Sequence, residues 1–139
     1  MYDVEISFPG GKAVDARIGL HTIHTDQPIA EGGQNAAPSP FDLFLASLGT
    51  CAGYYVLTFC QRHGIATADI RIYERCRVDE HGQLVQVELD IVLPAYFPVR
   101  YRDAVALSAE SCKVRTTLST PPVILVHSRI ANDSRPHAA

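Results

Sequence analysis

The chain has 139 residues with a formal net charge of −3, and 47% of its residues are hydrophobic. This size and composition predict a single globular domain over residues 1–131, followed by a short flexible tail at 132–139. The slightly acidic charge, without a basic stripe, argues against a nucleic-acid partner. The first residues, MYDVEISF, lack the basic start and apolar run of a signal peptide, so we expect a cytoplasmic protein.

The first half of the chain predicts a β-hairpin and a long helix. Apolar residues alternate with polar ones over 4–8 and 14–20, and Gly10-Gly11 supplies a turn between the two runs. A loop rich in glycine and proline at 26–40 follows. Ser39 as N-cap and Pro40 at the first helical position then predict a helix that runs to about residue 63 and ends at Gly64.

This helix is expected to be the core of the domain. At about 24 residues it would measure about 36 Å and cross the whole molecule. Its stretch at 43–60 has no charged side chain and reaches the minimum length of a membrane span. Two glycines, two threonines and a serine within that stretch favour a buried central helix over a membrane span.

The second half predicts another hairpin, two helical segments and a last strand. Apolar residues alternate over 70–78 and again over 85–91, on either side of the turn DEHGQ. Pro94 and Pro98 precede a helix at about 99–111, and a short helical turn is expected at 113–118. The segment VILVHSRI at 123–130 is typical of a strand. The expected fold class is therefore α+β.

Four cysteines, at positions 51, 60, 76 and 112, are compatible with a reducing compartment. They contain no Cys-x-x-Cys pair, which disfavours structural zinc, so we expect no metal. Cys60 and Cys76 have apolar or inward-facing positions typical of core thiols. Cys112, near the cations of Lys113 and Arg115, could be a reactive thiolate or an ordinary cysteine at a helix end.

Cys51 stands out because Gly49 and Gly53 flank it inside the predicted helix. Each glycine costs about 1 kcal/mol relative to alanine in a helix interior. The bare backbone would let another helix or a substrate come close. From residue types alone, this patch is equally well explained as a close helix contact in which Cys51 is filler.

The segments PSPFDLFLASLGTCAGYYVLTFC and AESCKVRTTLSTPP together resemble the OsmC/Ohr family, the osmotically inducible and organic hydroperoxide resistance proteins. This resemblance implies an OsmC-like fold in an intertwined homodimer with active sites at the interface. It also implies a thiol-dependent peroxidase for organic hydroperoxides, in which Cys51 attacks the peroxide and Cys112 resolves the sulfenic acid as a disulfide. An external dithiol reductant would be needed, but no metal or organic cofactor. The alternative is a non-catalytic dimer that senses redox state or binds a small hydrophobic ligand in the same cleft.

An activating cation is also expected, because Cys51 lies too far from the start of its helix to benefit from the helix dipole. The resemblance implies an arginine from the N-terminal hairpin, held by a glutamate at the start of the central helix. Arg17 is preferred to Lys12, because a guanidinium can bind a peroxide oxygen and a carboxylate together. The position of the glutamate is Phe41 here, which places the chain nearer the OsmC-like branch.

Three aromatic residues are candidates for substrate contact. Phe44, Tyr54 and Tyr55 share the Cys51 face of the predicted helix, where an aromatic lining would suit an organic peroxide. Packing at an interface would explain the two tyrosines equally well. In the implied dimer, the partner subunit would pack against the helix backbone at Gly49 and Gly53.

Overall fold

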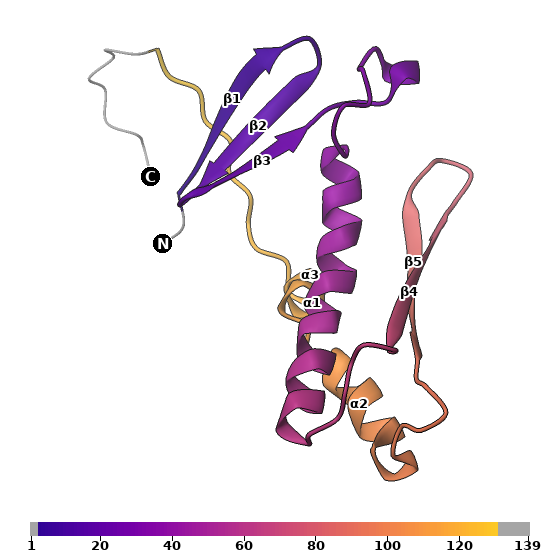
Figure 1. The fold of residues 1–139 in the computed structure, drawn as a ribbon. Coiled ribbons are helices and arrows are strands. Elements are labelled where there is room, and N and C mark those ends of the chain that lie inside the picture. Colours follow the sequence, from indigo (N-terminus) through magenta and orange to yellow (C-terminus); the bar gives the residue numbers. More distant parts are fainter. Residues whose placement is uncertain (1–2, 131–139) are drawn as a thin grey trace.

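The structure, a computed structural model, describes residues 3–130 as an α+β fold (Figure 1). A three-stranded antiparallel sheet comes first, followed by a long helix that leads to a two-stranded hairpin and two shorter helices. The elements are β1 (Val4–Gly10), β2 (Ala13–Ile18), β3 (His21–Thr25), η1 (Ile29–Glu31), α1 (Pro40–Arg62), β4 (Arg71–Val78), β5 (Leu84–Val92), η2 (Val99–Tyr101), α2 (Arg102–Ala109) and α3 (Lys113–Ser119).

The N-terminal sheet contains one strand more than expected. The predicted hairpin is confirmed as β1 and β2, but β2 ends at Ile18 instead of continuing to residue 20. Gly19 has a φ of +58°, a left-handed conformation that glycine adopts readily, and the chain reverses there. Ile18 therefore pairs with His21, and β3 becomes the third strand.

The loop between β3 and α1 is organised around Asp26. Its carboxylate accepts hydrogen bonds from the backbone N–H groups of Gln27, Gln34 and Ala36 at 2.8, 3.0 and 3.1 Å. These bonds, led by that of Ala36, hold the pKa of Asp26 below its usual value. A Cβ atom on Gly33 would lie 1.9 Å from the carbonyl oxygen of Gln27, so only glycine fits there.

The central helix α1 begins where its local sequence predicts. Ser39 accepts a hydrogen bond from the N–H of Asp42 at 3.2 Å, and the Asp42 carboxylate accepts one from the N–H of Ser39 at 2.9 Å. This is a complete capping box with Pro40 at the first helical position. The helix ends at Arg62, and Gly64 follows with a φ of +65°. The predicted start and end of this helix are confirmed.

One face of α1 forms the core with the C-terminal half of the domain. Four side chains at intervals of four residues are buried on this face: Leu48, Ala52, Val56 and Cys60. The helix contacts α2, α3 and β4, and Phe97, Val105 and Ala109 join the same buried cluster. By length and composition α1 could also cross a membrane, although central helices of a protein core pass the same test.

The two glycines around Cys51 are covered by the chain's own β4. A Cβ atom on Gly49 would lie 2.6 Å from Oε2 of Glu74, and one on Gly53 would lie 3.8 Å from Cδ1 of Ile72. The close approach at Gly49 therefore comes from a strand of the same chain. A contact within the chain thus occupies the space beside Gly49, and the packing of a partner subunit at the two glycines stays a prediction.

The second hairpin and the helices after it agree with the sequence predictions. Strands β4 and β5 pair antiparallel, with Tyr73 opposite Asp90. The helix expected at 99–111 starts as the 3₁₀ turn η2 and continues as α2, and α3 corresponds to the helical turn expected at 113–118.

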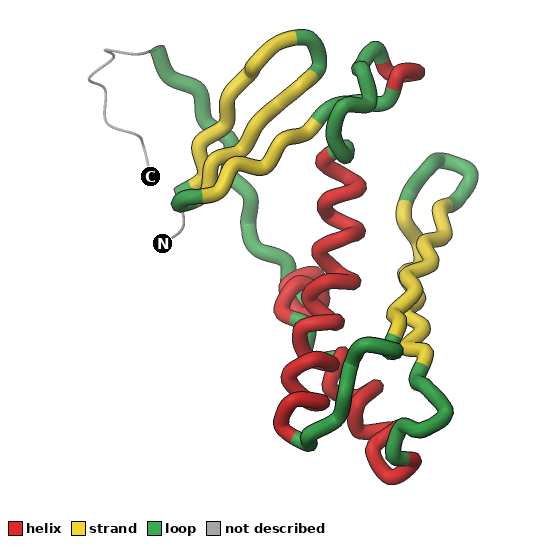
Figure 2. The backbone as a smooth tube through the Cα atoms, in the orientation of Figure 1, coloured by secondary structure: helices red, strands yellow, loops and turns green. Residues whose placement is uncertain are grey.

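The final strand expected at 123–130 is not formed. Figure 2 shows this segment as a loop that leaves α3, and it pairs with no strand among residues 3–130. A strand needs a neighbouring strand to pair its backbone hydrogen bonds, and residues 123–130 are not paired with any described strand. The side chains of Val123, Ile124, Leu125 and Val126 are 74 to 89% exposed. The tail expected at 132–139 lies outside the described residues.

Candidate active site

Two cysteines from separate elements meet beside the core. Cys51 lies in the middle of α1, and Cys112 is the N-cap residue of α3. The thiol of Cys112 donates a hydrogen bond to the carbonyl oxygen of Leu48 at 3.9 Å, and it lies near enough to Cys51 to lower the pKa of that thiol. Cys51 is partly buried, whereas Cys112 is only 2% exposed. The structure therefore brings together the two thiols that the sequence singled out.

The start of α3 supplies hydrogen-bond donors to Cys51. Partial burial alone would raise the pKa of this thiol. Hydrogen bonds from the N–H of Val114, the thiol of Cys112 and the N–H of Lys113 outweigh burial, so the pKa of Cys51 lies below its ordinary value. Donors to sulfur stabilise the thiolate, which is the nucleophilic form. Backbone amides, and not only a cation, can therefore activate Cys51.

Cys112 is shifted in the opposite direction. Burial raises its pKa most, and the neighbouring Cys51 raises it further. The N–H of Arg115 lies 3.4 Å from the Cys112 sulfur and opposes this shift only in part. The two shifts therefore favour the negative charge on Cys51 and the proton on Cys112. This is the arrangement that a nucleophile beside a resolving thiol requires.

The contribution of the α3 amides can be tested at Lys113. Proline suits this first helical position, and Cys112 before it has a ψ of 120°, which proline accepts in the preceding residue. Lys113→Pro removes one N–H donor, so the pKa of Cys51 should rise. Measured by alkylation with iodoacetamide across pH, the midpoint should move upward and the rate at neutral pH should fall. Lys113→Ala, which keeps the N–H and removes the cation, should leave the midpoint near that of the parent; an equal shift in both variants would contradict the role of the amide.

The two cations proposed from the sequence lie elsewhere in the single chain. Arg17, on β2, pairs with Glu5 of β1 in the N-terminal sheet. Lys12 follows the turn between these strands and lies against Gly32. Figure 1 shows this sheet beyond the N-terminal end of α1, away from α3. Within the described part of one chain, neither cation contributes to the pKa shift of Cys51.

The three aromatic candidates for substrate contact lie in two separate places along α1. Phe44 stacks on Phe41 near the start of the helix, with ring centroids 5.8 Å apart. Tyr54 and Tyr55 meet edge to face at 5.4 Å. These two tyrosines line a cavity of about 420 Å³ together with Thr58, Phe59, Arg62, His63, Ser108 and Ser111. Ser111 directly precedes Cys112, so this cavity begins close to the sulfur pair.

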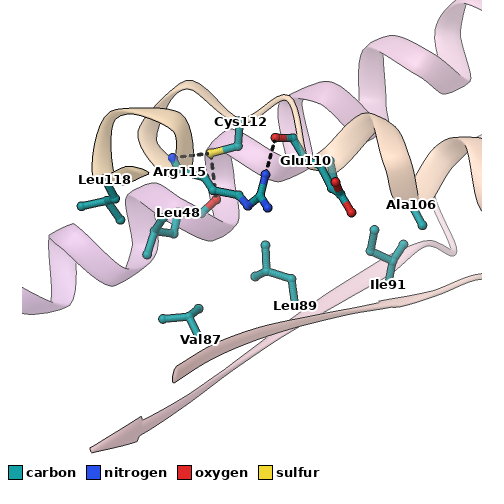
Figure 3. A pocket seen from close by; sticks show the side chains of 10 residues that line it. Leu48, Val87, Leu89, Ile91, Ala106, Glu110, Cys112, Arg115 and Leu118 are labelled. Carbon is teal, nitrogen blue, oxygen red and sulfur yellow. Dashed lines mark hydrogen bonds between the residues drawn. The ribbon is translucent and has the colours of Figure 1, made fainter. Parts of the chain in front are cut away.

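A second cavity of about 490 Å³ lies between the helices and β5 (Figure 3). Most of its walls are apolar, from Leu48, Val87, Leu89, Ile91, Ala106, Ala109 and Leu118, and Glu110, Cys112 and Arg115 complete it. The guanidinium of Arg115 donates to the carbonyl oxygen of Glu110 at 3.1 Å. Arg115 lies close to Cys112 along the chain, but the cavity depends on how α1, α2 and α3 pack against β5. Among residues 3–130, no group of three or more His, Cys, Asp or Glu side chains could hold a metal ion.

Comparison with known protein families assigns the chain to a family. Residues 32–127, which include both cysteines of the site and all of α1, match the family described as OsmC-like protein. The chain belongs to this OsmC-like family. No curated protein matches the OsmC-like chain significantly.

Solved structures support the OsmC-like fold at low sequence identity. A Psychrobacter arcticus protein, whose name refers to osmotic stress induction and detoxification, is 19% identical with a TM-score of 0.70, over 82% of this chain and 85% of its own. An organic hydroperoxide resistance protein OsmC from Legionella pneumophila is 18% identical with a TM-score of 0.54, over 85% and 88%. An organic hydroperoxide resistance protein from Elizabethkingia anophelis is 19% identical with a TM-score of 0.56, over 84% and 89%. At these sequence identities, the structural similarity shows a shared fold alone.

Proposed function

We propose that this OsmC-like protein is a thiol-dependent peroxidase that reduces organic hydroperoxides. The observation that carries the proposal is the environment of the Cys51 sulfur. The backbone N–H groups of Val114 and Lys113 and the thiol of Cys112 lower the pKa of Cys51. The names of the relatives from Legionella pneumophila and Elizabethkingia anophelis, which refer to organic hydroperoxide resistance, support the same activity. The four free cysteines suit the reducing cytoplasm, where we place the protein.

The proposed reaction uses the two thiols in turn. The Cys51 thiolate attacks one peroxide oxygen, the O–O bond breaks, and the alkoxide leaves with a proton as the alcohol. Cys51 is then a sulfenic acid. Cys112 attacks its sulfur, water leaves, and a disulfide forms between the two residues. An external dithiol returns the pair to the reduced state. The contact already present between the two thiols lets the second step occur before the sulfenic acid is oxidised further.

The organic part of the substrate is assigned to the aromatic face of α1. Phe44, Tyr54 and Tyr55 follow the same side of the helix as Cys51, and the two tyrosines line the cavity that begins beside Ser111. Aromatic walls stabilise an alkyl or aryl group by burial, whereas hydrogen peroxide gains nothing from them. We therefore expect larger organic hydroperoxides to be preferred over hydrogen peroxide.

The assembly we propose is a homodimer in which residues 123–130 pair with a sheet edge of the second copy. The apolar side chains at 123–126 are mostly exposed in one chain, and so are Val4, Ile6 and Phe8 on β1. A free strand edge can bind a further apolar segment by strand addition, and residues 123–126 are such a segment. In such a dimer, Arg17 of the partner subunit is our candidate for the cation that assists Cys51.

The deciding experiment combines an activity assay with mass spectrometry. The parent protein should consume cumene hydroperoxide when dithiothreitol is supplied, and peroxide treatment without thiol should link Cys51 to Cys112. A protein that forms this disulfide but turns over only slowly would instead favour redox sensing. Absence of both consumption and the disulfide would contradict the peroxidase proposal.

A further inference from the structure

We propose that the reducing thiol enters the cavity between α1, α2, α3 and β5 and forms its mixed disulfide with Cys112, releasing Cys51 first. This inference rests on the proposed function, because it concerns the reduction of the disulfide that the peroxidase cycle generates. It assigns the two half-reactions to two different cavities. The peroxide would react at Cys51 beside the cavity lined by the tyrosines, and the reductant would react at Cys112 in the cavity lined by β5.

The cavity gives access to one sulfur of the pair. Cys112 lines the cavity of about 490 Å³, and Cys51 is not among its lining residues. Figure 3 shows the Cys112 sulfur above Leu89, with Leu48 beside it. The walls near it are mostly apolar, so a thiol carried on an uncharged, apolar body fits this space.

The stability of the leaving thiolate also favours attack at the Cys112 sulfur. In thiol–disulfide exchange, the attacked sulfur keeps the incoming thiol and the other sulfur departs as a thiolate, faster when that thiolate is better stabilised. The backbone N–H groups of Val114 and Lys113 lower the pKa of Cys51, so they stabilise its thiolate when it leaves. Cys112 is deeply buried beside Leu48. Attack at Cys112 therefore releases the better stabilised thiolate.

Exposure to bulk solvent favours the opposite outcome, because Cys51 is the more exposed of the two residues. A thiol that attacked Cys51 would have to release Cys112 as a charge in a buried site, which is costly. The cavity gives the reductant thiol a route to Cys112, so the low solvent exposure of Cys112 does not prevent the attack. Arg115 lies in its wall, and a cation there favours the thiolate form of the incoming reductant.

The exchange balances as two displacements. The reductant thiolate attacks the Cys112 sulfur, the bond between the two protein sulfurs breaks, and its electron pair goes to Cys51 as a thiolate. The second thiol of the dithiol, after losing its proton, attacks the reductant sulfur in the mixed disulfide. Cys112 departs, takes up a proton and regenerates the thiol, and the reductant leaves as its own disulfide.

Mass spectrometry can identify the attacked sulfur. The protein is oxidised with diamide, exposed briefly to 2-mercaptoethanol, a monothiol that cannot complete the second displacement intramolecularly, and quenched with excess N-ethylmaleimide. The mercaptoethanol adduct should be found on Cys112 and the maleimide on Cys51. An adduct on Cys51 with maleimide on Cys112 would overturn the inference, as would failure of diamide to link the two residues.

A blocked cavity provides a kinetic test. Val87→Phe adds bulk to the cavity wall on β5, and Val85→Phe adds the same bulk to a position on that strand outside the cavity lining. Starting from the diamide-oxidised proteins, reduction by dithiothreitol should slow about fivefold or more in Val87→Phe and stay within about twofold of the parent in Val85→Phe. Reduction of Val87→Phe at the parent rate would overturn the inference. Diamide forms the disulfide without peroxidase activity, so the test does not depend on that activity. A protein that lacks peroxidase activity but is still reduced at Cys112 would contradict the proposed function and leave this inference standing.

Discussion

Cys51→Ser is expected to lower thiol-driven consumption of cumene hydroperoxide by at least about a thousandfold. A serine hydroxyl stays protonated at neutral pH, and the N–H groups of Lys113 and Val114 would have no thiolate to stabilise. The fold should survive, because serine is close to cysteine in size and Cys51 is only partly buried. The measurement is the initial rate of peroxide loss at saturating dithiothreitol, compared with the unfolding midpoint of each variant.

Two further cysteine variants make this result specific. Cys76→Ser changes an exposed thiol on β4 and should retain the parent rate. Cys112→Ser should still form the sulfenic acid on Cys51, which dimedone can label, but should lose the disulfide and become overoxidised during repeated turnover. Parent-like consumption by Cys51→Ser would remove the basis of the enzymatic proposal. Equal loss in Cys76→Ser would point to general destabilisation and not to chemistry at Cys51.

The double substitution Ile124→Asp with Leu125→Asp is expected to convert the proposed dimer into a monomer. These two residues point to opposite sides of an extended segment, so the pair places a charge on whichever face the second copy buries. Burying an unpaired carboxylate costs several kcal/mol, which is comparable to the stability of many dimer interfaces. Sedimentation equilibrium of the parent and the variant would report the change in mass.

A matched control uses an exposed turn. His81→Asp with Gln83→Asp adds two acidic residues at the tip of the hairpin between β4 and β5, where both positions are exposed. This control should sediment as the parent does. A dimeric Ile124→Asp, Leu125→Asp variant would show that the C-terminal segment does not hold two copies together.

The glycines around Cys51 show how much a sequence can leave open. Their cost within a helix was evident from residue type alone, but their explanation was not. Gly49 faces the Glu74 carboxylate across a contact between α1 and β4. Such a contact depends on how the hairpin docks on the helix, and no local pattern encodes that.

The sequence alone determined those elements whose signals are local. The capping box of Ser39 and Asp42, the proline at position 40 and the glycine at 64 set the ends of α1, because each acts through hydrogen bonds or backbone angles within a few residues. Alternation of apolar residues likewise predicted β4 and β5, whose pairing is closed by a short turn. The segments around Cys51 and Cys112, taken together, also indicated the family.

Only the tertiary structure decided what surrounds each functional group. The apolar pattern at 123–130 shows that the segment can form a strand, but strand formation requires pairing, and this segment is not part of either described sheet. The amides that stabilise Cys51 come from the start of α3, a helix distant in sequence, and Arg17 faces Glu5 instead of the sulfur pair. Nucleophile activation depends on distances across the fold, so docking of α3 against α1 determines it.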